Sequence, residues 1–144
     1  MTTSAASSEP PRLAIIGAGS MGSGLAALFA LRGFPVVLVD PVEGALARAD
    51  AAIDRQLAAL ATPEQARAAR ARLVPATAQA AAAQAELVIE AVPEKLELKR
   101  RIFAELDALC PPRTVLATNT SGLSVNAIAE AVSPERRKRF VGAH

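Results

Sequence analysis

The stretch Leu13-Ala-Ile-Ile-Gly-Ala-Gly-Ser-Met-Gly22 joins a short apolar run to the pattern G-x-G-x-x-G. An apolar run of this length predicts a β-strand buried on both faces. The residues after it, through Leu25, Leu28 and Phe29, predict a helix that Gly33 ends. Between a strand and a helix, the first glycine permits a tight turn and the second lets a diphosphate approach the backbone. The third lets the helix pack closely, so that its N-terminal N–H groups face the phosphates.

A second apolar run, Val36–Val39, is followed by Asp40. This aspartate lies about 20 residues beyond the glycines, which is the spacing expected for the acidic residue of a dinucleotide site. A carboxylate there accepts hydrogen bonds from the ribose diol of adenosine and repels a 2′-phosphate. No Arg or Lys follows within the next few residues, so the pattern favours NAD over NADP. The alternative is a structural turn beside a surface aspartate. The predicted cofactor-binding residues of this part are Gly17, Gly19, Ser20, Met21, Gly22 and Asp40.

Four further apolar runs, at 73–75, 87–92, 114–118 and 140–143, predict four more strands. Helical segments separate them at 41–72, at 93–109 and from Ser124 to about residue 132. Residues 78–85 are compatible with a brief helix or an ordered loop, and the long segment is expected to break at a capping box from Thr62 to Gln65. Such alternation predicts an α/β fold, a doubly wound and mainly parallel six-stranded sheet with helices on both faces.

Length and composition indicate one globular domain over residues 12–144, preceded by a disordered tail, residues 1–11. A net charge of +2 and 3% aromatic residues disfavour nucleic acid as a partner, and the basic run 136–139 is interpreted as a solvated face. No apolar stretch reaches the roughly 20 residues of a membrane span. The single Cys and the lack of an apolar signal region at the start of the sequence favour a cytoplasmic location. The sequence has no cluster of Cys, His, Asp or Glu with metal-ligand spacing, so we expect no metal site.

Polar residues also follow the predicted fourth, fifth and sixth strands, at the edge where ligands bind in open α/β sheets. Glu94 and Lys99 follow the fourth strand, where a purely structural role in a first helical turn is an equal alternative. Residues 119–121, Asn-Thr-Ser, follow the fifth and are also ordinary turn formers. His144 follows the sixth, where a frayed terminus is the plain alternative.

Three blocks, VIEAVPEKLELK (88–99), ATNTSGLSV (117–125) and RFVGAH (139–144), together with the glycine pattern, resemble the NAD-binding domain of 3-hydroxyacyl-CoA dehydrogenases over residues 12–144. The resemblance implies a Rossmann fold, an acyl-CoA substrate and NAD as cofactor. It implies that Glu94, Lys99 and Ser121 contact the nicotinamide half of NAD. It also implies that Ser121 holds the 3-oxygen of the substrate and that His144 is the general base.

The family pattern continues past the catalytic histidine, with a glutamate that orients it and a helical second domain that closes the cleft and forms the dimer. The sequence ends at His144, so we expect the chain alone to be a poor catalyst, because orientation is worth several powers of ten. The family's coenzyme A contacts have no match here, which leaves Arg55, Arg67 and Arg70 as candidates. The alternatives are a non-catalytic dinucleotide-binding module and an NAD-dependent dehydrogenase of another short hydroxy acid.

Overall fold

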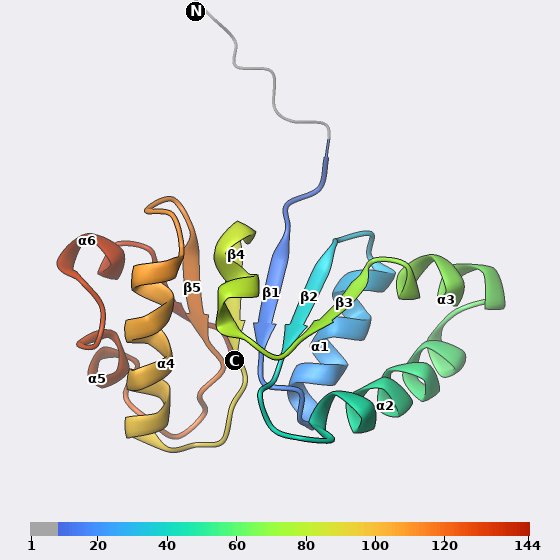
Figure 1. Ribbon diagram of the computed structural model, residues 1–144, viewed down its shortest axis with the longest axis horizontal. Helices are drawn as coiled ribbons and strands as arrows, with labels where there is room; N and C mark the ends of the chain where they lie inside the picture. Colours follow the sequence, from blue (N-terminus) through green and yellow to red (C-terminus); the bar gives the residue numbers. More distant parts are fainter. Residues whose placement is uncertain (1–8) are drawn as a thin grey trace, which may run out of the picture.

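The computed structural model describes residues 9–144, which form a single sheet of six parallel strands flanked by helices (Figure 1). The strands are β1 Leu13–Ile16, β2 Val36–Val39, β3 Leu73–Ala76, β4 Leu87–Glu90, β5 Val115–Thr118 and β6 Phe140–Gly142. The helices are α1 Ser20–Leu31, α2 Ala45–Leu60, α3 Pro63–Arg70, the 3₁₀ helix η1 Gln79–Gln84, α4 Leu96–Leu109, α5 Val125–Ala129 and α6 Pro134–Arg137. The strand order β3-β2-β1-β4-β5-β6, parallel throughout, confirms the predicted doubly wound fold.

The central strand β1 is buried on both faces, as its unbroken apolar run predicts. Leu13 and Ile15 belong to one apolar cluster, with α1, α2 and α3. Ala14 and Ile16 belong to the cluster on the other face, with η1, α4 and α5. Because successive side chains of a strand point to opposite faces, four residues are enough to anchor both helical layers.

One predicted helix boundary is confirmed, one open alternative is decided and one boundary differs. The helical segment from 41 to 72 does break at Thr62, whose hydroxyl accepts from Gln65 N at 3.3 Å while Thr62 N donates to Gln65 Oε1 at 3.0 Å. Residues 79–84 form a 3₁₀ helix, one of the two outcomes left open. Helix α4 begins at Leu96 and not at 93, because the segment before it is held by side chains of the site described below.

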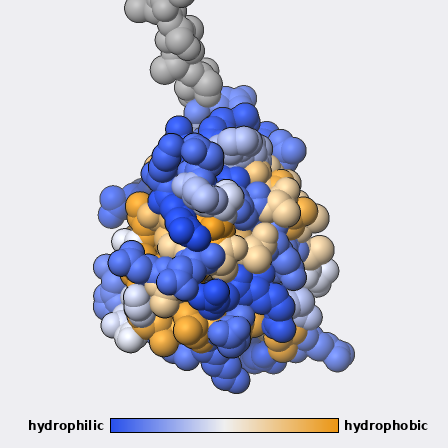
Figure 2. Space-filling model, turned by 90° about the vertical axis from the view of Figure 1, so that its left-hand side faces the viewer, coloured by the Kyte–Doolittle hydropathy of each residue, from blue (hydrophilic) through white to orange (hydrophobic). Residues whose placement is uncertain are grey.

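The basic run 136–139 differs from the interpretation as a solvated face. Arg136 is buried, and its guanidinium binds Asp107 Oδ1 at 3.0 Å and the carbonyl oxygens of Cys110 and Thr114 at 2.8 and 2.6 Å. Its neighbours remain at the surface, on the end of the molecule that carries α5 and α6, where polar residues cover much of the face (Figure 2). Arg136 therefore stabilises the connection between α4 and β5.

The expected tail, residues 1–11, falls mostly outside the described residues. Glu9 and Pro10, which are described, line a cavity on the sheet together with Arg12. No helix among residues 9–144 is long and apolar enough to cross a membrane.

Candidate functional site

The structure brings the sequence-predicted site residues to one edge of the sheet, the lower edge in Figure 1, where the parallel strands end. The glycine-rich turn follows β1, and Asp40 follows β2. Glu94 lies between β4 and α4, Ser121 follows β5 and His144 follows β6. The strand order reverses between β1 and β4, and in doubly wound sheets the ligand crevice opens at this reversal.

The three glycines of the turn differ in whether the fold requires glycine at that position. Gly17 has φ +104°, and a Cβ there would lie 2.6 Å from Ala91 O, so both conformation and space require glycine. A Cβ on Gly22 would lie 1.8 Å from Gly17 O, because α1 packs directly on the turn. A Cβ on Gly19 would meet nothing within 4 Å. The fold therefore explains Gly17 and Gly22, whereas the space next to Gly19 is open.

The N-terminus of α1 is open beside Gly19. Gly19 is the N-cap residue and provides no side-chain cap, and the first turn carries no acidic residue. Ser20 and Met21 are exposed there. The first N–H groups of a helix lack partners within it and attract anions, so this cradle fits the diphosphate of a dinucleotide.

Asp40 is tied to the glycine-rich turn. Its Oδ2 accepts a hydrogen bond from Ala18 N at 2.8 Å, and its Oδ1 accepts one from Val42 N at 2.9 Å. A carboxylate offers about four acceptor positions, so about two remain for a ribose diol. Asp40 thus orients the turn and keeps acceptor capacity for a ligand.

A cavity of about 830 Å³ extends from the glycine-rich turn past Asp40 to η1 and α4. Its volume lies in the range of cofactor pockets. Arg48 of α2 and Arg101 of α4 also line it. Neither of these cations is among the few residues that follow Asp40 in the sequence. The volume and the lining residues fit the adenosine half of a dinucleotide.

A network of buried charges lies where β4 and β5 end. Glu90 and Lys99 have no exposed side-chain surface, and Lys99 Nζ lies 2.6 Å from Glu90 Oε2. The same ammonium group binds Glu94 Oε1 at 3.0 Å and Val92 O at 3.2 Å, so all three of its protons have acceptors. Glu90 also accepts from Thr118 Oγ1 at 2.7 Å and from Val92 N at 2.8 Å. Each buried charge is therefore paired and hydrogen-bonded, as burial requires.

Glu94 joins this network to the loop after β5. Its Oε2 accepts from Thr120 Oγ1 at 2.7 Å and from Gly122 N at 3.2 Å, while its side chain stays 43% exposed. The Thr120 hydroxyl, followed by Lys99, lowers the pKa of Glu94 from 4.5 to about 2. Glu94 lies before α4 and not in its first turn, so the sequence-based expectation of a helical position was wrong. The residue is an ionised carboxylate that links two loops and still faces solvent.

Ser121 and His144 lie at the open side of the same edge, and both are exposed. Ser121 sits between two residues that Glu94 holds, Thr120 and Gly122. Ala143 N donates to Thr118 O at 2.9 Å, which keeps the residue before His144 beside β5. The His144 side chain makes no hydrogen bond or ion pair with any of residues 9–144. The structure thus fixes the backbone next to both residues and leaves both side chains accessible to a ligand.

Two members of the site, Glu90 and Thr118, were not singled out from the sequence. Thr120 was a candidate ligand contact as part of residues 119–121, and here its hydroxyl donates to Glu94. A signal for Glu90 was present, because an acidic residue at the end of an apolar run predicted to be buried needs a charged partner. Lys99 was predicted to touch the cofactor, but here it is fully buried and its protons are all engaged by protein atoms. Of the coenzyme A candidates, Arg70 pairs with Asp50 at 2.7 Å and Asp54 at 3.1 Å.

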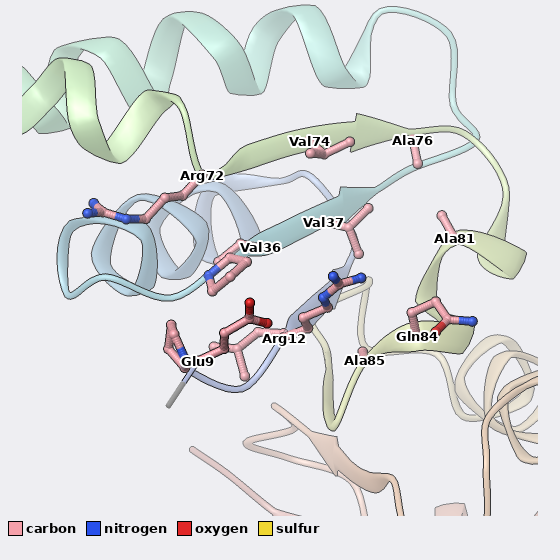
Figure 3. A pocket seen from close by; sticks show the side chains of 13 residues that line it. Glu9, Arg12, Val36, Val37, Arg72, Val74, Ala76, Ala81, Gln84 and Ala85 are labelled. Atoms are coloured by element: carbon pink, nitrogen blue, oxygen red, sulfur yellow. The ribbon is translucent and has the colours of Figure 1, made fainter. Parts of the chain in front are cut away.

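Other candidate sites are less favourable. Cys110 is buried, and burial raises the pKa of its thiol, which disfavours a nucleophilic role. No cluster of three potential metal ligands occurs in the described part of the chain. A second cavity, of about 560 Å³, lies over the β1–β3 half of the sheet beside Arg12, Arg72 and Gln84 (Figure 3). None of the sequence-predicted site residues lines it.

Comparisons with known proteins agree with this geometry. Residues 12–144 match the family model described as 3-hydroxyacyl-CoA dehydrogenase, NAD binding domain. A 3-hydroxyadipyl-CoA dehydrogenase of Escherichia coli K12 is 44% identical over a 130-residue alignment that covers 86% of this chain and 27% of that protein. A 3-hydroxybutyryl-CoA dehydrogenase of Bradyrhizobium diazoefficiens is 38% identical over 138 residues, 92% of this chain and 46% of that protein.

Solved structures give the same result. The crystal structure of 3-hydroxybutyryl-CoA dehydrogenase from E. coli K12 superposes with a TM-score of 0.87 at 40% identity, over 93% of this chain and 29% of that one. The (S)-3-hydroxybutyryl-CoA dehydrogenase of Ralstonia eutropha gives 0.87 at 32% identity, over 94% and 49%. The chain thus spans less than half the length of the two curated relatives described above.

Proposed function

The chain belongs to the 3-hydroxyacyl-CoA dehydrogenase family as its NAD-binding domain, and on that premise we propose that it serves an enzyme interconverting 3-hydroxyacyl-CoA and 3-ketoacyl-CoA. The observation that carries the cofactor side of this proposal is the glycine-rich turn. Gly19 is the one glycine of the three at which an added Cβ would meet no protein atom, and it caps a helix with open N–H groups. A diphosphate there, with its ribose at Asp40, uses both features.

We propose that NAD is held by residues from both sides of the crevice. Gly17, Gly19, Ser20, Met21 and Gly22 receive the diphosphate, and Asp40 receives the adenosine ribose. Glu94 and Ser121 face the nicotinamide half. Lys99 acts through Glu94 as a positioning residue, since its own ammonium group is buried. When bound, the cofactor supplies a nicotinamide ring that exchanges hydride with the substrate carbon.

The proton of the substrate 3-hydroxyl is proposed to pass to a ring nitrogen of His144, while Ser121 Oγ holds the same oxygen. An imidazole suits this step because it exchanges protons near neutral pH. The exposure of both side chains supports a role toward a ligand. Neither side chain is oriented by a described protein partner, so efficient catalysis needs the further contacts that the rest of a complete enzyme provides.

Cofactor binding is tested by titrating the chain with NADH and NADPH and following the fluorescence of the dihydronicotinamide ring. We expect NADH to bind more tightly, because Asp40 repels a 2′-phosphate. Equal or tighter binding of NADPH would assign that phosphate to Arg48 and Arg101, and it would overturn the NAD preference.

The substrate is tested with a chimera in which this chain replaces the matching 130 residues of the E. coli 3-hydroxyadipyl-CoA dehydrogenase. We expect the chimera to oxidise NADH with 3-ketoacyl-CoA and to lose that activity on His144→Ala. A soluble chimera that binds NADH without turning over any 3-ketoacyl-CoA would favour the non-catalytic module. Turnover of a free short hydroxy acid instead would favour a dehydrogenase of such acids.

For the compartment and the assembly, we propose a cytoplasmic enzyme that is a dimer when complete. The single free thiol, buried at Cys110, suits a reducing compartment. Size-exclusion chromatography of the chimera and of the chain alone tests the assembly, with a dimer expected only for the chimera.

A further inference from the structure

The end of the large cavity away from the glycine-rich turn carries two polar side chains that the reaction does not use. Gln79 begins η1 and Glu105 lies on α4, and both line the cavity. Nε2 of Gln79 donates a hydrogen bond to Glu105 Oε2. Oε1 of Gln79 is the only buried side-chain nitrogen or oxygen among residues 9–144 without a hydrogen-bond partner. A buried acceptor without a donor is costly, and such groups mark places where a ligand completes the structure.

Glu105 fixes which way the Gln79 amide faces. A carboxylate only accepts hydrogen bonds, so the NH₂ group must face Glu105 and the carbonyl oxygen must face away from it. Reversing the amide would bring two acceptors together. Gln79 and Glu105 both line this end of the cavity, and the Gln79 carbonyl oxygen, which neighbouring atoms cover, lacks a donor. A ligand that satisfies this oxygen must bring a donor and displace the covering atoms.

The proposed binding mode places the nucleotide base at this end. With the diphosphate at the glycine-rich turn and the ribose at Asp40, the base on that ribose extends into the remaining part of the cavity. Val42, Leu98 and Ile102 line that part and offer apolar surface to an aromatic ring. Val42 is 62% exposed although it is apolar, as expected for a residue that a ligand covers.

We propose that Gln79 is a specificity residue that reads the exocyclic amine of adenine. In this arrangement the amide plane turns slightly toward the ring, Oε1 accepts from the amine, and Nε2 keeps its bond to Glu105. Glu105 is then a positioning residue, which holds the amide with its acceptor toward the base. The site thereby selects a base with an amine over a base with an oxo group at the same carbon, because the oxo group leaves acceptors facing each other. This inference rests on the proposed binding of NAD.

The test compares NADH with reduced nicotinamide hypoxanthine dinucleotide, which carries an oxo group in place of the amine. We expect the chain to prefer NADH by about tenfold in Kd, the size of one well-formed buried hydrogen bond. Gln79→Ala should reduce this preference to less than about twofold, by weakening NADH binding and by removing the acceptor that opposes the oxo group, so that the affinity for the hypoxanthine dinucleotide is unchanged or higher. Binding of that dinucleotide also verifies that the variant is folded.

Two further variants complete the test. Gln84→Ala is the matched control, because Gln84 ends the same 3₁₀ helix but lines the second cavity (Figure 3), and it should keep the full preference. Glu105→Ala should reduce the preference, because the freed amide can turn either group to the base. An equal preference in the chain and in Gln79→Ala, with NADH bound, would overturn this inference alone. Absence of NADH binding to the unmodified chain would overturn the proposed function together with it.

Discussion

The two sides of the crevice are built by different means. On the glycine-loop side, residues 17–22 with Asp40, the surface is mostly backbone, namely the N–H groups of a helix start and a turn with three glycines. On the Glu94 side, which comprises Glu90, Glu94, Lys99 and Thr120, the surface rests on charged and hydroxyl side chains. Here β4, α4 and the loop after β5 each contribute a partner.

This difference determines how each side responds to change. A backbone surface fails when a side chain is added, whereas a network of buried charges fails when one member is removed. The first failure is local and steric, and the second leaves an unpaired charge in a medium of low polarity. Five substitutions test this contrast, from the largest expected effect to the smallest.

Removing the buried cation of the Glu94 side should cost most. Lys99→Met keeps the length of the side chain but leaves Glu90 without its 2.6 Å partner, so we expect a loss of about 3–5 kcal/mol in the free energy of unfolding. Denaturant unfolding measures it. Lys95→Met, at an exposed position just before the same helix, is the control and should change stability by less than about 0.5 kcal/mol. Equal effects of the two substitutions would show that the buried pair contributes no stability.

Adding a methyl group should separate folding from binding on the glycine-loop side. Gly22→Ala places Cβ against Gly17 O and should destabilise the fold by about 3 kcal/mol. Gly19→Ala meets no protein atom, so its stability should stay within about 0.5 kcal/mol while the Kd for NADH rises about tenfold or more. Thermal unfolding and NADH titration of both variants provide the data. A Gly19→Ala variant with unchanged NADH affinity would exclude this cradle as the diphosphate site.

Removing the charge of Asp40 should weaken the ligand more than the fold. Asp40→Asn keeps one acceptor oxygen for the turn but loses charge-assisted hydrogen bonds, so NADH binding should weaken by about 1–3 kcal/mol. Calorimetric titration is the measurement. Asp50→Asn, on α2 and paired with Arg70, should leave the affinity unchanged. An Asp40→Asn variant that binds NADH as tightly as the parent would remove Asp40 from the site.

The hydroxyl of Thr120 should have the smallest effect, visible in a titration. Thr120→Val removes the largest contribution to the low pKa of Glu94, so that pKa should rise from about 2 toward 4.5. Ionised Glu94 stabilises the fold fully above about pH 4.5, and this contribution disappears as the pH falls toward 2. The pH dependence of stability in that window should therefore be shallower in the variant. Carbon NMR of the carboxyl groups reports the pKa, and Ser121→Ala should leave it at about 2.

Much of the fold could be predicted from sequence because its signals are local. Six apolar runs separated by helical segments predict the parallel sheet, and Thr62 and Gln65 predict a helix start from four consecutive residues. The glycine-rich turn could be predicted for the same reason, since Gly17 and Gly22 answer steric demands within their own strand–turn–helix unit and its immediate neighbour.

The remaining features depend on which segments that are far apart in the sequence come into contact, and no local sequence pattern contains that information. Lys99 looks like a surface lysine of a helix, yet it is the buried partner of Glu90 and Glu94. Arg136 belongs to a run of surface cations by sequence, but it is buried and binds carbonyl oxygens of the connection between α4 and β5. The sequence by itself therefore determined the strands, the turn and the acidic residue after β2, through steric and periodic rules of short range. Only the tertiary structure decided which charges are buried and which face solvent, because burial and pairing depend on contacts between separate segments.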